Sequence, residues 1–163
     1  MPTALPLNHR SFIKLATWNI YGNGARGLTM LKLNNISCMY ALLLFIELQL
    51  MGNVNRLSRT TGLDFVFTNR LVSIFNIIFF ILGTAFFVFY TNKHFKESKL
   101  NYFTAILWLP YFAIFVFVFT AIWPNVNPAE MVPPVHGLLA IGAMVTYPFY
   151  ITFINLLSTL KYN

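Results

Sequence analysis

The chain has 163 residues, of which 58% are hydrophobic, 18% aromatic and only 9% charged. Soluble domains carry about 25% charged residues, so this composition excludes an ordinary water-soluble domain and indicates an integral membrane protein. Eleven Lys and Arg residues against four Asp and Glu residues give a net charge of +7. Because the basic residues lie at the ends of apolar segments, we expect them to meet anionic lipid or acidic protein surfaces and not nucleic acid.

The first 34 residues contain no acidic residue and form a basic N-terminal arm. Between Arg10 and Tyr21 the apolar side chains fall on one face of a helical wheel, with Arg10 and Lys14 on the other. This pattern predicts an amphipathic helix lying in the headgroup plane. The three glycines between Tyr21 and Gly27 predict a flexible turn after it. We expect Arg10, Lys14 and Arg26 to contact lipids or a partner protein.

Three uncharged segments predict transmembrane helices, since about 20 apolar residues are needed to cross a bilayer. These segments are residues 71–92, 102–123 and 137–160. A fourth segment, residues 33–55, is less apolar and contains Glu47 and Gln49, and we interpret it as a span as well. The expected fold is therefore all-α, with the arm over residues 1–34 and a bundle of four transmembrane helices over residues 35–163.

Orientation follows from the basic residues in the short loops. The loop after the second span carries three lysines and the next loop carries none, so we expect the former, together with both termini, on the cytoplasmic or matrix-like side. Arg56 and Arg59 fall on the opposite side in this topology. Either these two arginines pair with lipid phosphate or with a partner, or residues 33–55 do not span the membrane.

Glu47 is the one acidic residue within the predicted spans. An ionised side chain at the bilayer centre costs about 2.5–3.5 kcal/mol on insertion scales, so Glu47 is a candidate functional residue. It could act in a proton or cation relay with Gln49 and Asn53, or it could fix the docking of a neighbouring helix, which we favour. Asn76 and Asn155 are further polar candidates inside the spans, where such residues usually bond between helices.

The histidines and the single cysteine, Cys38, limit the cofactors. His94 and His136 are expected on opposite membrane faces, about 30 Å apart, so no haem held by two histidines of this chain is expected. His136 is a candidate axial ligand to a pigment or metal, although a histidine at a helix start is the simpler interpretation. We expect bound lipids and no metal site, and the identity of any other cofactor stays open.

The carboxylates and histidines do not form a motif for catalysis, because they are spread over separate spans and loops. We therefore expect a non-catalytic accessory subunit of a larger membrane complex, for example an energy-converting one, with other membrane subunits and lipids as partners. One alternative is a small homo-oligomeric transporter or channel that uses Glu47. A second is a pigment-, quinone- or lipid-binding membrane protein. A bacterial or archaeal plasma membrane and an organelle inner membrane fit the sequence equally well.

Overall fold

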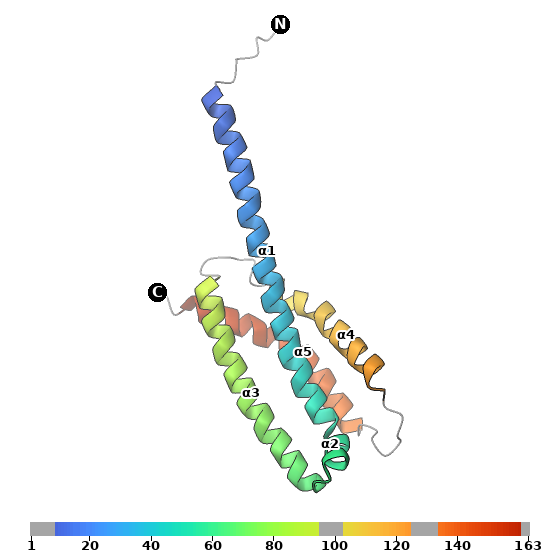
Figure 1. Cartoon of the computed structure of the whole chain (residues 1–163). Helices are drawn as coiled ribbons and strands as arrows, with labels where there is room; N and C mark the ends of the chain where they lie inside the picture. The colour runs from blue at the N-terminus through green and yellow to red at the C-terminus, as the bar shows by residue number, and fades with distance from the viewer. Residues whose placement is uncertain (1–8, 95–102, 125–133, 161–163) are drawn as a thin grey trace.

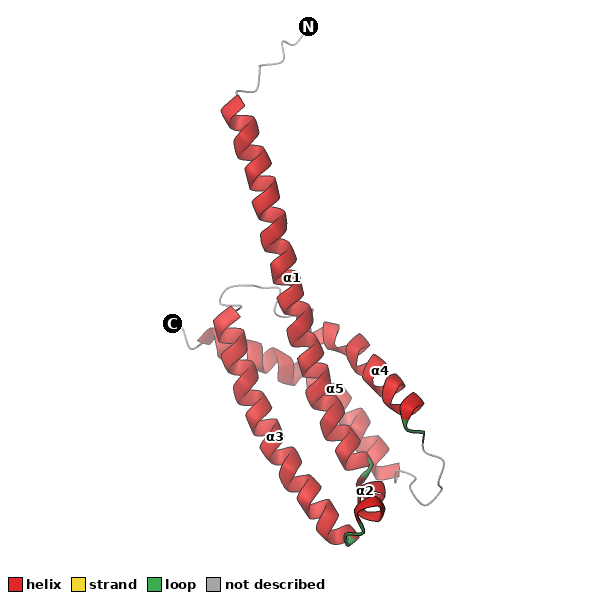
Figure 2. Cartoon of the chain, viewed as in Figure 1, coloured by secondary structure: helices red, strands yellow, loops and turns green. Residues whose placement is uncertain are grey.

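The computed structural model describes residues 9–94, 103–124 and 134–160, with side chains from residue 30 to 93, 103 to 124 and 134 to 158. Every regular element in these ranges is helical (Figure 2), as the sequence predicts. The helices are α1 (His9–Gly52), α2 (Val54–Thr61), α3 (Phe65–His94), α4 (Thr104–Ile122) and α5 (Pro134–Leu160). Residues 95–102, between α3 and α4, and residues 125–133, between α4 and α5, lie outside the described residues.

Four of the helices are long and apolar enough to cross a membrane. The spans are Met30–Gly52 within α1, Phe65–Lys93, Thr104–Ile122 and Pro134–Ser158. The prediction of four transmembrane helices is therefore confirmed, including the weaker first segment. Helices suit this environment because they satisfy their backbone hydrogen bonds internally, where no water is present to do so.

The least apolar span, in α1, lies at the centre of the bundle. α1 packs against α3, α4 and α5, while α5 also contacts α3 and α4, so that α3 and α4 flank the α1–α5 pair (Figure 1). Over 18 consecutive residues of the α1 span, 33% of the residues are buried, compared with 11% to 17% over the same length of the other spans. The central position explains the composition of α1, because its polar side chains meet neighbouring helices in place of lipid.

The flexible turn predicted after Tyr21 is wrong. α1 continues as one helix through the glycines between Tyr21 and Gly27 and extends well beyond the other helices (Figure 1). Glycine costs about 1 kcal/mol relative to alanine in a helix but does not prevent one, because it still provides its backbone donor and acceptor. A helix over residues 10–21 is confirmed, whereas its contact with headgroups stays a prediction.

Residues 62–64 form a short connection that reverses the chain between α2 and α3. Gly62 takes a left-handed conformation, with φ of 71°, and ends α2. This conformation favours glycine because it has no Cβ. The Asp64 carboxylate then accepts hydrogen bonds from the backbone amides of Val66 (3.0 Å) and Phe67 (3.3 Å) and caps the start of α3.

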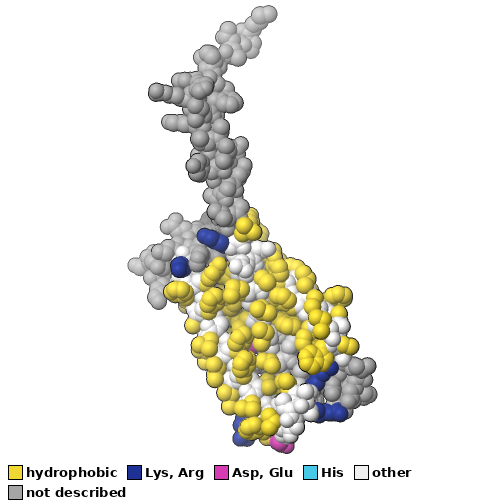
Figure 3. Space-filling view, viewed as in Figure 1, with side chains coloured by type: hydrophobic (Ala, Val, Ile, Leu, Met, Phe, Trp, Pro, Cys, Tyr) yellow, Lys and Arg dark blue, Asp and Glu magenta, His cyan; other side chains and the backbone are white. Residues whose placement is uncertain are grey.

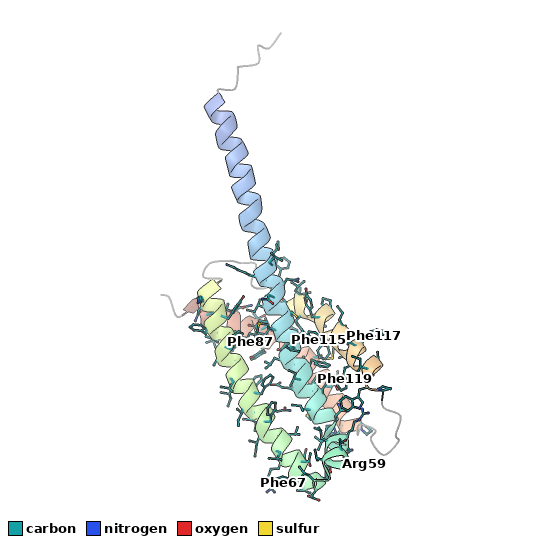
Figure 4. All side chains as sticks on the ribbon, viewed as in Figure 1. Arg59, Phe67, Phe87, Phe115, Phe117 and Phe119 are labelled. Atoms are coloured by element: carbon teal, nitrogen blue, oxygen red, sulfur yellow. The ribbon has the colours of Figure 1, made fainter. Side chains whose placement is uncertain are left out.

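Aromatic side chains form much of the bundle's interior and much of its outer surface. Trp108 is fully buried, with its ring centroid 4.9 Å from that of Tyr147. Phe87 lies between α3 and α1, whereas Phe117 points away from the bundle (Figure 4) and is 75% exposed. Hydrophobic side chains cover the middle of the visible face and the charged ones lie toward its ends (Figure 3), as expected for a surface that meets lipid.

Candidate functional site

Glu47 meets α3 inside the bundle. The Asn76 side-chain amide donates a hydrogen bond to the Glu47 backbone carbonyl at 3.2 Å. The Oε1 atom of Glu47 and the Oδ1 atom of Asn76 are both buried without a hydrogen-bond partner. The structure thus brings together two of the predicted polar candidates, and it leaves two acceptor oxygens unmatched there.

Gln49 does not join Glu47. The Asn53 side-chain amide bonds to the backbone carbonyl of Gln49 at 2.8 Å and to its side-chain oxygen at 3.0 Å. Gln49 lines a cavity with Phe119 and Trp123, on the side of α1 that faces α4. These contacts give no support to a relay from Glu47 through Gln49 and Asn53, which stays a prediction, because residues two positions apart lie on different faces of a helix.

Two tyrosines of α5 bond to the neighbouring helices α3 and α1. The Tyr150 hydroxyl forms a 2.8 Å hydrogen bond with the Thr84 hydroxyl on α3. The Tyr147 hydroxyl donates to the Tyr40 backbone carbonyl at 2.6 Å. The sequence analysis missed these residues, although tyrosine inside a span is a usable signal because membrane tyrosines concentrate at the interfaces.

Further unmatched polar groups occur near the end of α3 and on α1. The Tyr40 ring stacks on Phe87, with the centroids 3.9 Å apart. The hydroxyl oxygens of Tyr40 and Thr91 are both buried without a hydrogen-bond partner. The Oδ1 atom of the next residue, Asn92, is also buried without a partner.

His136 lies at the opposite end of the bundle from His94, as predicted. It borders a cavity of about 150 Å³ between α1, α2, α3 and α5, whose polar lining includes Asn55 and Asn69. Its Nδ1 atom is buried without a hydrogen-bond partner. Within the described part of the chain, no three His, Cys, Asp or Glu residues group as metal ligands. The role of His136 as an axial ligand to a pigment or metal stays a prediction.

Asn155 belongs to a different interface from Glu47. Its side-chain amide donates to the Thr104 hydroxyl at 3.2 Å, which joins α5 to α4. Both residues are buried. This is the usual structural use of a polar side chain between transmembrane helices.

The basic candidates lie away from this interior. The Arg56 guanidinium lies 4.7 Å from the Trp123 ring centroid, beside a cavity of about 220 Å³ with a mainly apolar lining. Arg59 is exposed in the last turn of α2 (Figure 4). Arg10, Lys14 and Arg26 lie on the N-terminal extension of α1, where only the backbone is described.

The unmatched polar atoms lie on three of the helices. Among the described side chains, all six buried nitrogen or oxygen atoms without a hydrogen bond belong to α1, α3 or α5, and none to α4. Comparison of the chain with protein-family models, curated proteins and solved structures gave no match.

Proposed function

We propose that this chain is a non-catalytic, structural subunit of a larger membrane complex, attached to a neighbouring subunit by the N-terminal extension of α1. The length of α1 carries the proposal. The helix has 44 residues, whereas about 20 are enough to cross the hydrocarbon core. The rest extends beyond the other helices of the bundle (Figure 1).

The extension is a weak helix by itself. It contains Gly22, Gly24 and Gly27, and each glycine lowers helix stability by about 1 kcal/mol relative to alanine. Helical stability in proteins comes mostly from packing and not from intrinsic propensity. A neighbouring surface that packs along this segment would supply the missing stabilisation.

The charge of the extension indicates what that surface offers. Three basic residues and no acidic residue precede the span that begins at Met30. They are Arg10, Lys14 and Arg26. The best match is an acidic face of another membrane protein close to the bilayer, because charge complementarity steers association and selects partners.

The exposed surface of the bundle fits both lipids and the helices of other subunits. Large apolar side chains cover α3, for example Ile77 and Leu82, which are 61% and 63% exposed. At one membrane end, the apolar cavity beside Arg56 suits a phospholipid, with its acyl chain in the cavity and its phosphate near the guanidinium. Bound lipids and a complex in a bacterial, archaeal or organelle inner membrane are part of this proposal.

The test is the native mass of the species that carries this chain after mild extraction from its own membrane. One variant replaces Arg10, Lys14 and Arg26 by glutamine. The matched control replaces Lys93, Lys96 and Lys99 by glutamine, which removes the same charge from the same predicted side of the membrane.

We expect the wild-type chain and the control to co-migrate with several different proteins, and the extension variant to be released from them. Release should also be promoted by salt, because salt screens contacts between exposed charges. A wild-type particle that contains only copies of the 18.8 kDa chain would refute the proposal.

A further inference from the structure

The cavity of about 220 Å³ beside Arg56 lies where two membrane-spanning helices end. Leu50 and Phe119 line it from within the last turn of α1 and of α4. Arg56 and Trp123 line it from beyond the last residues of these two helices. Tryptophan is enriched at the boundary between hydrocarbon and headgroups. The cavity therefore extends across this boundary, with its cation on the headgroup side.

The lining of the cavity is mainly apolar although four of its residues carry uncharged polar side chains. The Asn53 side-chain amide donates to the Gln49 side-chain oxygen at 3.0 Å. The hydroxyls of Thr60 and Thr61 donate to backbone carbonyls of the preceding turn, at 2.8 Å and 2.7 Å. A cavity with such a lining accepts hydrocarbon in preference to water, because water needs two to four polar partners. The bilayer supplies hydrocarbon as acyl chains.

Arg56 is held at the headgroup side of the cavity by an aromatic ring. Its guanidinium lies over the Trp123 ring, 4.7 Å from the centroid, which is within the range of a cation–π interaction. The flat face of the guanidinium meets the ring, whereas its five N–H donors point outward in its plane. Arg56 can therefore bind two oxygens of a phosphate group while it keeps its contacts within the protein.

The charges around the cavity favour an anionic headgroup over a zwitterionic one. Among the described residues that line the cavity, Arg56 is charged and none is acidic. Arg59 is exposed three positions further along α2, and residues with this spacing are neighbours on a helix. A zwitterionic headgroup would bring its own cation close to these two guanidinium groups. Basic residues at a membrane surface attract anionic lipids instead.

We propose that this cavity is a binding site for an anionic phospholipid, with one acyl chain in the cavity and the phosphate group bound by Arg56. The inference rests on the lipid-binding part of the proposed function and specifies the lipid. Lipid on both sides of the Arg56–Trp123 contact joins the end of α4 to α2. The phosphate also accounts for arginines on the membrane side where the predicted topology has few basic residues.

The experiment uses the quenching of tryptophan fluorescence by brominated acyl chains, which requires close contact with the ring. Trp123 is 52% exposed and borders the cavity, whereas Trp108 is fully buried. The full chain is purified and reconstituted in phosphatidylcholine bilayers with increasing fractions of brominated phosphatidylglycerol or brominated phosphatidylcholine. A Trp123→Phe variant gives the background from the other tryptophans.

We expect half-maximal quenching of Trp123 at an about five-fold lower fraction of brominated phosphatidylglycerol than of brominated phosphatidylcholine. This factor is the effect of one basic residue close to an anionic membrane surface. Arg56→Gln should make the two fractions equal. Arg70→Gln is the matched control, because Arg70 is exposed near the start of α3 and does not line the cavity. It should keep the five-fold preference, with equal helix content by circular dichroism in both variants.

A further arm separates a phospholipid from a free phosphate ion. Excess inorganic phosphate is added at constant ionic strength to the wild-type chain in brominated phosphatidylglycerol. We expect unchanged quenching, because the ion has no acyl chain to occupy the cavity. Relief of quenching by inorganic phosphate would overturn the proposal and assign a site for the free ion.

Two other results would overturn the proposal. Equal fractions of the two brominated lipids for the wild-type chain would exclude an anionic phospholipid and favour an acidic segment of a partner subunit at Arg56. An equal loss of preference in Arg56→Gln and Arg70→Gln would show that the overall charge of the surface, and not this cavity, selects the lipid. The assay contains no partner protein, so its failure is distinct from failure of the native-mass test of the proposed complex.

Discussion

Gly83 sets the distance between α1 and α3, and replacing it by alanine provides a direct test of the packing. A Cβ atom at Gly83 would lie 2.6 Å from the Leu43 Cδ1 atom and 3.2 Å from its Cδ2 atom. Leu43 is itself buried, with 4% exposure. Small residues at such positions let two transmembrane helices approach closely, so Gly83→Ala must displace the Leu43 side chain.

The cost can be bounded from these distances. Apolar atoms in contact are normally about 4 Å apart, so Leu43 must retreat by more than 1 Å from the 2.6 Å position. Overpacking of this kind costs about 1–3 kcal/mol. A groove of about 310 Å³ beside Leu43 gives the side chain room to rotate. We therefore expect the clash by itself to lower the unfolding free energy by the lower part of that range, about 1–2 kcal/mol.

Gly142→Ala is the matched control. Gly142 lies in α5 and a Cβ atom there would have no neighbour within 4 Å. The change in helix propensity is similar at both positions, so the difference between the two variants isolates the clash. The assay is reversible unfolding in mixed micelles by titration with SDS, followed by far-ultraviolet circular dichroism.

A double-mutant cycle completes the test. In a Leu43→Ala background the obstructing methyl groups are absent. Gly83→Ala should then change the unfolding free energy only through the difference in helix propensity between glycine and alanine. The coupling free energy should then equal the clash, about 1–2 kcal/mol. Equal stabilities of Gly83→Ala and Gly142→Ala, or a coupling energy near zero, would refute this account of the α1–α3 contact.

The remaining predictions concern the interior and the topology. Tyr147→Phe should lower the unfolding free energy by about 0.6 kcal/mol, the mean for hydrogen bonds between membrane helices, since it removes the bond to the Tyr40 carbonyl; unchanged stability in the same titration would argue against that bond. In a Cys38→Ser background, Lys93→Cys and Arg59→Cys should react with a membrane-impermeant maleimide from opposite sides of sealed vesicles. Labelling of both from one side would contradict the four-span topology.

The sequence determined the class of fold and the number of spans. Composition and the gaps between charges indicate four apolar segments, and a bilayer requires each segment to satisfy its own backbone hydrogen bonds. The structure confirms all four. The glycines after Tyr21 misled the sequence analysis, because glycine lowers helix stability without specifying a turn, and α1 continues through them.

The tertiary structure decided which polar side chains meet. Glu47 and Asn76 are 29 positions apart and come together because α1 and α3 pack side by side. Gln49 is only two positions from Glu47 but faces α4, because a helix turns its side chains by about 100° per residue. Asn155 joins α4 instead. Span length and composition are properties of a local segment, whereas a site depends on helix rotation and neighbours, which only packing fixes.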